Sequence, residues 1–361
     1  MTSILLIKTG SFGDVLRTTS VLPGLARRFP DLELTWLVAP AAVSLVSGHR
    51  LVSRVVTGDP TDGASMDVAR EELSGQRWDW VISLDDEEGL CALAASLDAG
   101  RLSGATLDGD GRRTYTEDME PWFGMGLLSR DGQEAADRRK RENERTHPEL
   151  FASMLGVDEG KPELPLPAEA RAAAAALADR VGIDAGSLVC GLNTGAGDRW
   201  PSKELPVDRV VAYAGALARA LGREVTFLVL GGPAERARND RLLDGLATLD
   251  APVRPVDAGT DHDLRAFAAV VGLCDLLLTS DSLALHLGVA VEVPIVSFFA
   301  PTSAAEIELY GRGEKVVSTA PDYCSYRGDA DRSTITVERL VEASLGVLAA
   351  HAGQQKLPSR P

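Results

Sequence analysis

The chain has 361 residues, with 37 lysines and arginines against 53 aspartates and glutamates, so its formal net charge is −16. Hydrophobic residues make up 45% and charged residues 25%, a composition that excludes a disordered chain and predicts a globular one. The acidity argues against nucleic acid as a partner, because phosphate binding needs a surplus of basic residues. It also limits any attraction to an anionic membrane surface to a peripheral contact.

Cysteine usage and the N-terminus predict a cytoplasmic protein. The four cysteines lie far apart and form no C-x-x-C pair, so we expect neither a zinc ribbon nor a disulfide framework. The N-terminus lacks a basic region, and its apolar run at residues 4–7 is too short for a signal peptide. No uninterrupted apolar stretch reaches 18 residues, so no membrane span is expected.

Short apolar strands alternate with helical patterns along the chain, which predicts a parallel α/β architecture. The first half is expected to begin with a buried strand at residues 4–7. A helix follows over residues 16–29, where apolar residues recur at helical spacing. Further strands of this half are expected at residues 34–38, 55–56 and 80–84.

A proline-rich stretch at residues 162–167 is typical of an interdomain linker, and a second series of elements follows it. It begins with an alanine-rich helix, Ala168–Val181, that ends at Gly182. Thr336 is expected to cap a last helix running to about Ala350, and the tail from Gln354 to be frayed. The other expected elements are strands at 188–192, 225–230, 276–279 and 294–299 and a helix at 208–221. Two Rossmann-like domains, 1–165 and 166–335, facing across a cleft, are the economical interpretation.

The loop after the first strand holds the motif Lys-Thr-Gly-Ser-Phe-Gly-Asp at residues 8–14. Its glycines let the backbone approach a ligand at the carboxyl edge of the sheet. It is neither a Walker loop nor G-x-G-x-x-G. Asp31 and Glu33 lie before the second strand instead of at its end, which disfavours a nicotinamide dehydrogenase. Asp14 is then either a helix N-cap or a general base acting on a hydroxyl.

A glycine-rich turn opens the second half and suits a diphosphate. Thr194 and Gly195 follow a strand, with Arg199 and Lys203 close by, so backbone amides, a hydroxyl and cations can face one charge. A connecting loop with solvated bases explains the same spacing. Glu235, after the next strand, is either an acceptor for ribose hydroxyls or part of a turn.

An Asp-Ser pair ends a later strand, and a helix that carries a histidine leaves from it. The helix N-terminus with Ser282 can hold a phosphate, and Asp281 can bind sugar hydroxyls. His286 lies one turn into the helix, where it either contacts the same ligand or is a core histidine.

Five motifs come in one order along the chain and together resemble the heptosyltransferase family of lipopolysaccharide core assembly, glycosyltransferase family 9. They are Gly13-Asp14, Trp-Pro-Ser-Lys at 200–203, Gly-Gly-Pro-Ala-Glu at 231–235, Asp281-Ser282 with His286, and Phe-Phe-Ala-Pro-Thr at 298–302. Residues 142–143 and 306–313 also look like that family, so the similarity covers nearly the whole chain.

The resemblance implies a GT-B fold with an N-terminal acceptor domain and a C-terminal donor domain. It implies that a last helix, 336–352, packs back on the first domain. The family inverts the anomeric carbon, needs neither a metal nor another cofactor, and usually takes ADP-L-glycero-β-D-manno-heptose as donor. The acceptor it implies is a carbohydrate or another small molecule, which receives the heptose on a hydroxyl or an amine.

The resemblance also implies roles for the motif residues. Asp14 is the base that takes the proton from the acceptor. Lys203 and Thr194, beside Gly195, hold the diphosphate, and Glu235 holds the nucleoside. Asp281, Ser282 and His286 hold the phosphate–sugar portion of the donor.

The sequence departs from the family pattern at three places. Leu283 follows the Asp-Ser pair where many members have glycine, and Ala300 stands where glycine is common. Cys324 is alone where related members carry a cysteine cluster. None of these changes affects Asp14 or Lys203. The predicted donor site in the second half therefore stands, and the identity of the acceptor stays open.

The acceptor side has several candidates. Gly13 and Arg17 lie beside Asp14, and the basic run that includes Arg138, Arg139 and Lys140 is either an anion site or a solvated helix face. The acidic run at 85–88 instead favours a cationic or polyhydroxylated acceptor. Asp-Gly-Asp at 108–110 resembles a metal-binding motif of other glycosyltransferases, but a polar turn is the favoured interpretation.

Three alternatives to a lipopolysaccharide enzyme stay open at this point. The acidity and the missing cysteine cluster favour a glycosyltransferase of natural-product biosynthesis with a soluble acceptor. A sugar-nucleotide epimerase on the same fold would form its product without an acceptor. A non-catalytic nucleotide-binding protein would bind nucleotide without depending on Asp14.

Overall fold

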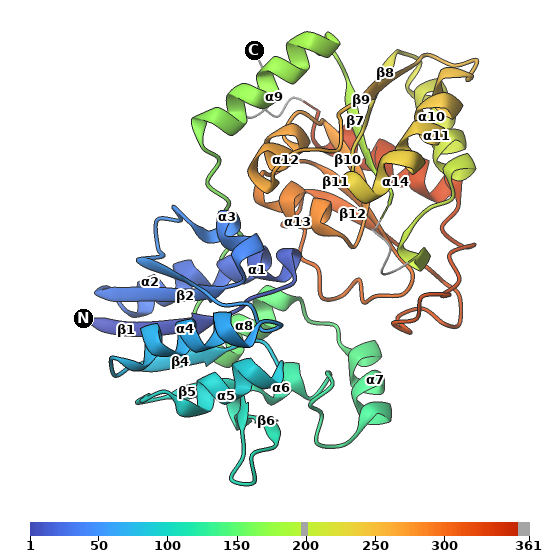
Figure 1. The fold of residues 1–361 in the computed structure, drawn as a ribbon. Helices are drawn as coiled ribbons and strands as arrows, with labels where there is room; N and C mark the ends of the chain where they lie inside the picture. Colours follow the sequence, from blue (N-terminus) through green and yellow to red (C-terminus); the bar gives the residue numbers. More distant parts are fainter. Residues whose placement is uncertain (196–200, 353–361) are drawn as a thin grey trace. The chain divides into compact units, whose positions relative to one another are not determined.

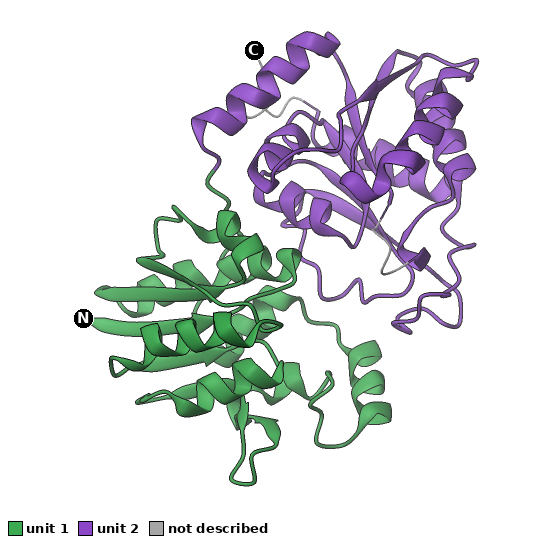
Figure 2. Ribbon diagram, in the orientation of Figure 1, with its two compact units in different colours: residues 1–165 green, residues 166–361 purple. Residues whose placement is uncertain are grey.

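The computed structural model describes residues 1–195 and 201–352, and the chain divides into two compact units (Figure 2). Unit 1 is Met1–Pro165 and unit 2 is Leu166–Pro361. The division falls within the proline-rich stretch. Each unit has its own sheet and is described by itself.

Unit 1 is built on a six-stranded sheet with the order β3-β2-β1-β4-β5-β6 (Figure 1). The central strand β1 pairs in parallel with both neighbours, so that Leu5 lies opposite Thr35 on one side and Val81 on the other. The last strand, β6, runs antiparallel to β5. The strands are β1 Thr2–Ile7, β2 Leu32–Val38, β3 Arg54–Thr57, β4 Trp80–Ser83, β5 Leu102–Leu107 and β6 Arg113–Tyr115. The strands expected in this half are confirmed, and β5 and β6 are additional.

Helices cover both faces of the sheet of unit 1 (Figure 1). Leu5 and Ile7 belong to a core that includes α4 and α5, and strand alternation turns Ile4 and Leu6 to the other face. Each fully buried leucine or isoleucine contributes about 1.5–3 kcal/mol. The helices are α1 Phe12–Thr18, η1 Thr19–Val21, α2 Leu22–Arg28, η2 Pro40–Ala42, α3 Val43–Val46, α4 Gly63–Ser74, α5 Glu88–Ser96, η3 Glu117–Met119, α6 Glu120–Phe123, α7 Gln133–Glu142 and α8 His147–Leu155.

The single helix expected over residues 16–29 is wrong. The chain forms α1, a 3-10 turn and then α2, which starts at Leu22 with Pro23 in its first turn. Proline has no amide hydrogen, and its ring clashes with the carbonyl four residues earlier, so it is tolerated only where a helix begins. The Thr18 hydroxyl donates to the Asp14 carbonyl at 2.7 Å.

Unit 2 holds a second six-stranded sheet with the order β12-β11-β10-β7-β8-β9, in which all paired strands are parallel. Counted within the unit, the sequence of strands is 3-2-1-4-5-6, the order of a doubly wound dinucleotide-binding sheet. The strands are β7 Val189–Asn193, β8 Val225–Val229, β9 Val253–Asp257, β10 Leu276–Ser280, β11 Ile295–Phe299 and β12 Gly313–Val317. The four strands expected here are confirmed. The outer strands β9 and β12 were not expected.

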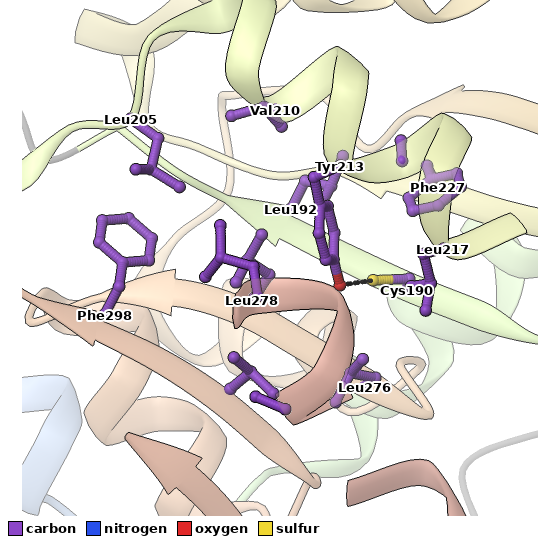
Figure 3. Close-up of a cluster of buried hydrophobic side chains, with 14 of the residues drawn as sticks. Cys190, Leu192, Leu205, Val210, Tyr213, Leu217, Phe227, Leu276, Leu278 and Phe298 are labelled. Carbon is purple, nitrogen blue, oxygen red and sulfur yellow. Dashed lines mark hydrogen bonds between the residues drawn. The ribbon is translucent and has the colours of Figure 1, made fainter. Parts of the chain in front are cut away.

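A large core lies between this sheet and α10, α11 and α14 (Figure 3). Val210, Tyr213 and Leu217 of α10 are buried together with Leu192 of β7. Tyr213 lies 3.8 Å from the Cys190 sulfur, and burial raises the pKa of that thiol to about 12. The helices of unit 2 are α9 Ala168–Val181, η4 Pro201–Lys203, α10 Val207–Leu221, η5 Pro233–Glu235, α11 Arg236–Ala247, α12 Leu264–Val271, α13 Leu283–Ala290 and α14 Val337–Ala350.

The last helix, α14, begins as expected, with the Thr336 hydroxyl accepting from the amide of Arg339. Leu340, Ala343 and Val347 are buried in the core of unit 2. This is the packing that the structure describes, and the expected return of 336–352 to the first domain stays a prediction. The tail from residue 353, which includes Gln354, lies outside the described residues.

Candidate active site

The polar residues of unit 1 gather where the strand order reverses. Strands β1 and β4 are neighbours, and β1 is also the turning point of the 3-2-1-4-5-6 order. Ligands of open α/β sheets bind beyond the carboxyl ends of the strands at this point. Lys8 and Thr9 follow β1, and Asp85 follows β4 after one residue.

Asp14 lies in the first turn of α1 with its carboxylate about one-third exposed. One oxygen, Oδ1, is 2.9 Å from Nη2 of Arg17. The other, Oδ2, accepts from the Ser11 hydroxyl at 3.3 Å and lies 4.0 Å from Nζ of Lys8. The N-cap of α1 is Ser11, so the interpretation of Asp14 as the cap is wrong.

Lys8 and Asp85 form a buried ion pair that the sequence did not point to. Asp85 Oδ2 also accepts from the amide of Thr9 at 2.5 Å and from the Thr9 hydroxyl at 2.8 Å. Burial alone would lower the pKa of Lys8, but Asp85 and Asp14 together raise it above its usual value. Asp85 is therefore bound at the end of β1 by Lys8 and Thr9. A contact of the acidic run at 85–88 with an acceptor stays a prediction. The sequence did hold a signal for this pair, because Lys8 and Asp85 follow two strands that are parallel neighbours in the sheet.

Arg17, a candidate for binding the acceptor substrate, forms an ion pair with Asp14. Its guanidinium lies 5.4 Å from the ring of Trp122, a distance that suits a cation–π contact. Trp122 in turn packs edge-on against His147 and Phe151 of α8. Gly13, the other candidate beside Asp14, is buried in the first turn of α1.

The basic run lies on α7 and has ion pairs of its own. Arg139 binds Glu120 at 3.0 Å and Asp131 at 2.5 Å, while the neighbouring Arg138 is exposed and Lys140 partly buried. The two ion pairs of Arg139 are thus made with carboxylates other than Asp14. The Asp-Gly-Asp motif forms the expected turn, in which Asp108 accepts from the amides of Asp110 and Arg112 at 2.9 Å.

In unit 2 the polar residues again lie where the strand order reverses, beyond β7 and β10. Lys203 Nζ donates to Asp281 twice, to Oδ2 at 2.8 Å and to the backbone carbonyl at 2.9 Å. His286 Nε2 lies 3.9 Å from Asp281 Oδ1. Burial would raise the pKa of Asp281, but Lys203 and His286 outweigh it and hold that pKa below its usual range. Three predicted site residues thus form one cluster.

Two hydroxyls lie at the same edge. Ser282 is the N-cap of α13, and its hydroxyl donates to Asn193 at the end of β7 at 3.2 Å instead of capping the helix. Thr194 is 1% exposed, and its hydroxyl has no hydrogen-bond partner among the described residues. A buried hydroxyl without a partner is costly, so it is a candidate for a ligand contact.

Glu235 lies against the glycine-rich turn. A Cβ atom at Gly195 would approach Glu235 Cγ to 2.7 Å, and one at Gly231 would lie 3.0 Å from Glu235 Cβ. A side chain at Gly195 would therefore displace Glu235, and one at Gly231 would require Glu235 to give way slightly. Glu235 Oε2 accepts from the amide of Gly232 at 2.8 Å, which holds the carboxylate in this turn. Residues 196–200, which include the predicted Arg199, lie outside the described residues.

A cavity of about 760 Å³ lies at the other edge of the sheet of unit 2. It is lined by residues that precede β7, β10 and β11, such as Leu188, Asp275 and Pro294. Because α/β sites form at the carboxyl ends of strands, we do not assign the donor to this cavity. Among the described residues, no group of three acidic, histidine or cysteine side chains is arranged to hold a metal ion.

Comparisons with known proteins agree with this geometry. The family described as Glycosyltransferase family 9 (heptosyltransferase) matches residues 124–333. Lipopolysaccharide heptosyltransferase 1 of Escherichia coli K12 is 26% identical over 324 residues, which cover 87% of this chain and 92% of that protein. Its counterpart from Pseudomonas aeruginosa is also 26% identical, over 86% of this chain and 82% of that protein.

Solved structures show the same fold. A glycosyltransferase family 9 structure from Veillonella parvula has a TM-score of 0.75 at 20% identity, covering 97% of this chain and 98% of that one. An E. coli heptosyltransferase with ADP-2-deoxy-2-fluoro heptose has a TM-score of 0.58 at 23% identity, covering 97% and 100%.

The two α/β sheets, parallel except for β6, and these neighbours define a GT-B fold. Since the family match spans more than half of the residues, the chain belongs to glycosyltransferase family 9, and it is a heptosyltransferase-like enzyme. No helix among the described residues is both long and apolar enough to cross a bilayer.

Proposed function

We propose that this protein transfers a heptose from ADP-heptose to a hydroxyl of an acceptor glycan, with inversion at the anomeric carbon. The observation that carries the proposal is the cluster of Lys203, Asp281 and His286 at the strand-order reversal of unit 2. It lies where a sheet of this order binds nucleotides. The related lipopolysaccharide heptosyltransferases support a heptose donor and a core-glycan acceptor.

Positive charge is needed where the donor diphosphate leaves. Lys203 supplies an ammonium group there, and the N-terminus of α13 at Ser282 adds a partial positive charge. The Thr194 hydroxyl can satisfy its missing hydrogen bond on a phosphate oxygen. We expect this set to stabilise departing ADP without a metal ion. Glu235, held beside Gly195, would then accept from the ribose hydroxyls.

Asp14 is the group best placed in unit 1 to act as a base. Its carboxylate is partly exposed, and its bonds to Ser11 and Arg17 fix its direction. As the acceptor oxygen attacks the anomeric carbon, the C–O bond to ADP breaks and Asp14 takes the hydroxyl proton. Attack from the face opposite the leaving group inverts the configuration.

A calorimetric titration with ADP, UDP, GDP and dTDP tests the donor assignment first. Tight binding of ADP alone supports the heptosyltransferase, and preference for another diphosphate overturns the heptose donor. Transfer from ADP-heptose to a lipopolysaccharide-core acceptor then tests the reaction. Product formed without any acceptor would instead establish an epimerase.

A second acceptor class follows from the charge. A net charge of −16 disfavours a phosphorylated, membrane-anchored acceptor and favours a soluble, neutral or aminated one. Detergent-free turnover with soluble aminated and hydroxylated acceptors, beside the core glycolipid, separates the two classes.

A further inference from the structure

The ion pair of Lys8 and Asp85 lies beside the proposed base but has no part in the proton transfer itself. Both side chains are nearly buried, with 11% of Lys8 and 5% of Asp85 exposed. Such a pair is seldom kept for stability, because burying two charges costs about what their attraction returns. Its placement next to Asp14 calls for another explanation.

Asp85 is held at three points on the end of β1. One oxygen binds the Lys8 ammonium group, and the other accepts from both the amide and the hydroxyl of Thr9. Lys8 Nζ is then 4.0 Å from Asp14 Oδ2. This distance is too long for a hydrogen bond but short enough for electrostatic attraction.

Removing Asp85 would change the partner of Lys8. A buried ammonium group needs a counter-ion, and among the described residues Asp14 is the other carboxylate within 4.0 Å of it. A direct Lys8–Asp14 pair would occupy Oδ2 and make the carboxylate a weaker base. Arg17 already binds Oδ1, so both oxygens would then face a cation, and Asp14 would take the acceptor proton less readily.

We infer that Asp85 is a positioning residue, which holds the Lys8 ammonium group beside the Asp14 carboxylate but off it, so that Asp14 stays basic enough to take the proton of the acceptor hydroxyl. The inference rests on the proposed function, in which Asp14 is the base. Other charged groups around this cluster are Arg17 on α1 and Glu87 before α5, and both are left unchanged in the test.

The test compares Asp85→Asn, Lys8→Met and the double variant. We expect Asp85→Asn to lower kcat with ADP-heptose by about 10- to 100-fold, the effect of a misplaced reacting group, with little change in the donor KM. We expect the double variant to recover most of that loss, because no ammonium group is left to cover Asp14. Turnover is normalised to the folded enzyme, counted by ADP-binding stoichiometry.

Titration of Asp14 gives a readout that does not depend on turnover. With ¹³Cγ-labelled aspartate, assigned through Asp14→Asn, the Asp14 midpoint should fall by about one pH unit or more in Asp85→Asn. It should return to or above the starting value in the double variant. If Asp85→Asn alone does not fold, the double variant is compared with Lys8→Met, and similar kcat values are expected, since the inferred effect of Asp85 on the reaction acts through Lys8.

Asp79→Asn is the matched control. Asp79 accepts from the amide and the hydroxyl of Ser3 at the start of β1, as Asp85 does from Thr9 at its end, but it has no lysine to hold. An unchanged Asp14 midpoint in Asp85→Asn, or a double variant as slow as Asp85→Asn, overturns the inference. If wild-type protein transfers no heptose, the proposed function fails while the titration still decides where Asp85 holds Lys8.

Discussion

At the scale of single residues, Asp14 is the most exposed of the four charged residues Lys8, Asp14, Arg17 and Asp85, and the proposed reaction depends on it. Replacing Asp14 with alanine should lower turnover by about 10²–10⁴-fold, because the other carboxylate of this group, Asp85, is bound by Lys8 and Thr9. ADP binding should not change. Steady-state kinetics and calorimetry measure both. Asp67→Ala on α4 is the control, since Asp67 pairs only with an exposed arginine. Near-normal turnover would remove Asp14 from the mechanism.

Lys203 gives a prediction for the donor half. Lys203→Met should weaken ADP binding by about tenfold or more, because a charge-assisted hydrogen bond contributes about 1.5–3 kcal/mol. It also leaves the Asp281 carboxylate buried without its cation. The variant Lys203→Met with Asp281→Asn removes both charges and shows whether the loss comes from the ligand contact. Lys140→Met on α7 is the control, and equal ADP affinity in all three proteins would contradict the assignment.

At the scale of elements, the structure shows how the chain starts and stops its helices. Thr336 caps α14, and its hydroxyl accepts from the amide of Arg339. Thr336→Ala should destabilise unit 2 by about 1 kcal/mol, as expected for a lost N-cap. Denaturant unfolding measures the change. Thr248→Ala, at the end of α11, removes an exposed hydroxyl that only bonds a carbonyl, so its effect should stay within about 0.5 kcal/mol. Similar losses in both would refute the cap.

The proline at α2 and the glycines at the helix ends also act at this scale. Gly182 ends α9 in the left-handed conformation, with a φ of 68°, which the sequence predicted from its place after an alanine-rich helix. At Pro23, by contrast, the helix prediction from the sequence was wrong. The helical spacing of its neighbours predicted one continuous helix, but the missing amide hydrogen and the ring of Pro23 make a new helix start there.

At the scale of the whole molecule, the charge pairs make stability depend on pH. The pKa of Asp281 is lowered in the folded protein, so its contribution to stability is present above the unfolded value near pH 4 and is lost as the pH falls through the folded value. We expect the wild-type protein to lose stability in acid more steeply than Asp281→Asn. Thermal melting between pH 3 and 7 measures both, and parallel curves would exclude this linkage.

The sequence by itself determined the fold class, because inner strands of parallel sheets are continuous apolar runs that can be read without tertiary contacts. It did not predict outer strands such as β6, β9 and β12, which carry polar residues and depend on a neighbour for their pairing. The family motifs likewise predicted roles for Asp14, Lys203 and Asp281 one by one.

Only the tertiary structure decided which of these residues meet. Lys8 and Asp85 are 77 positions apart, and Lys203 and Asp281 are 78 apart, so no local pattern joins them. The parallel pairing of β1 with β4, and of β7 with β10, brings their carboxyl ends together. Because a charge buried at those ends needs a counter-ion, Asp85 pairs with Lys8, although the sequence had offered it as a contact for the acceptor.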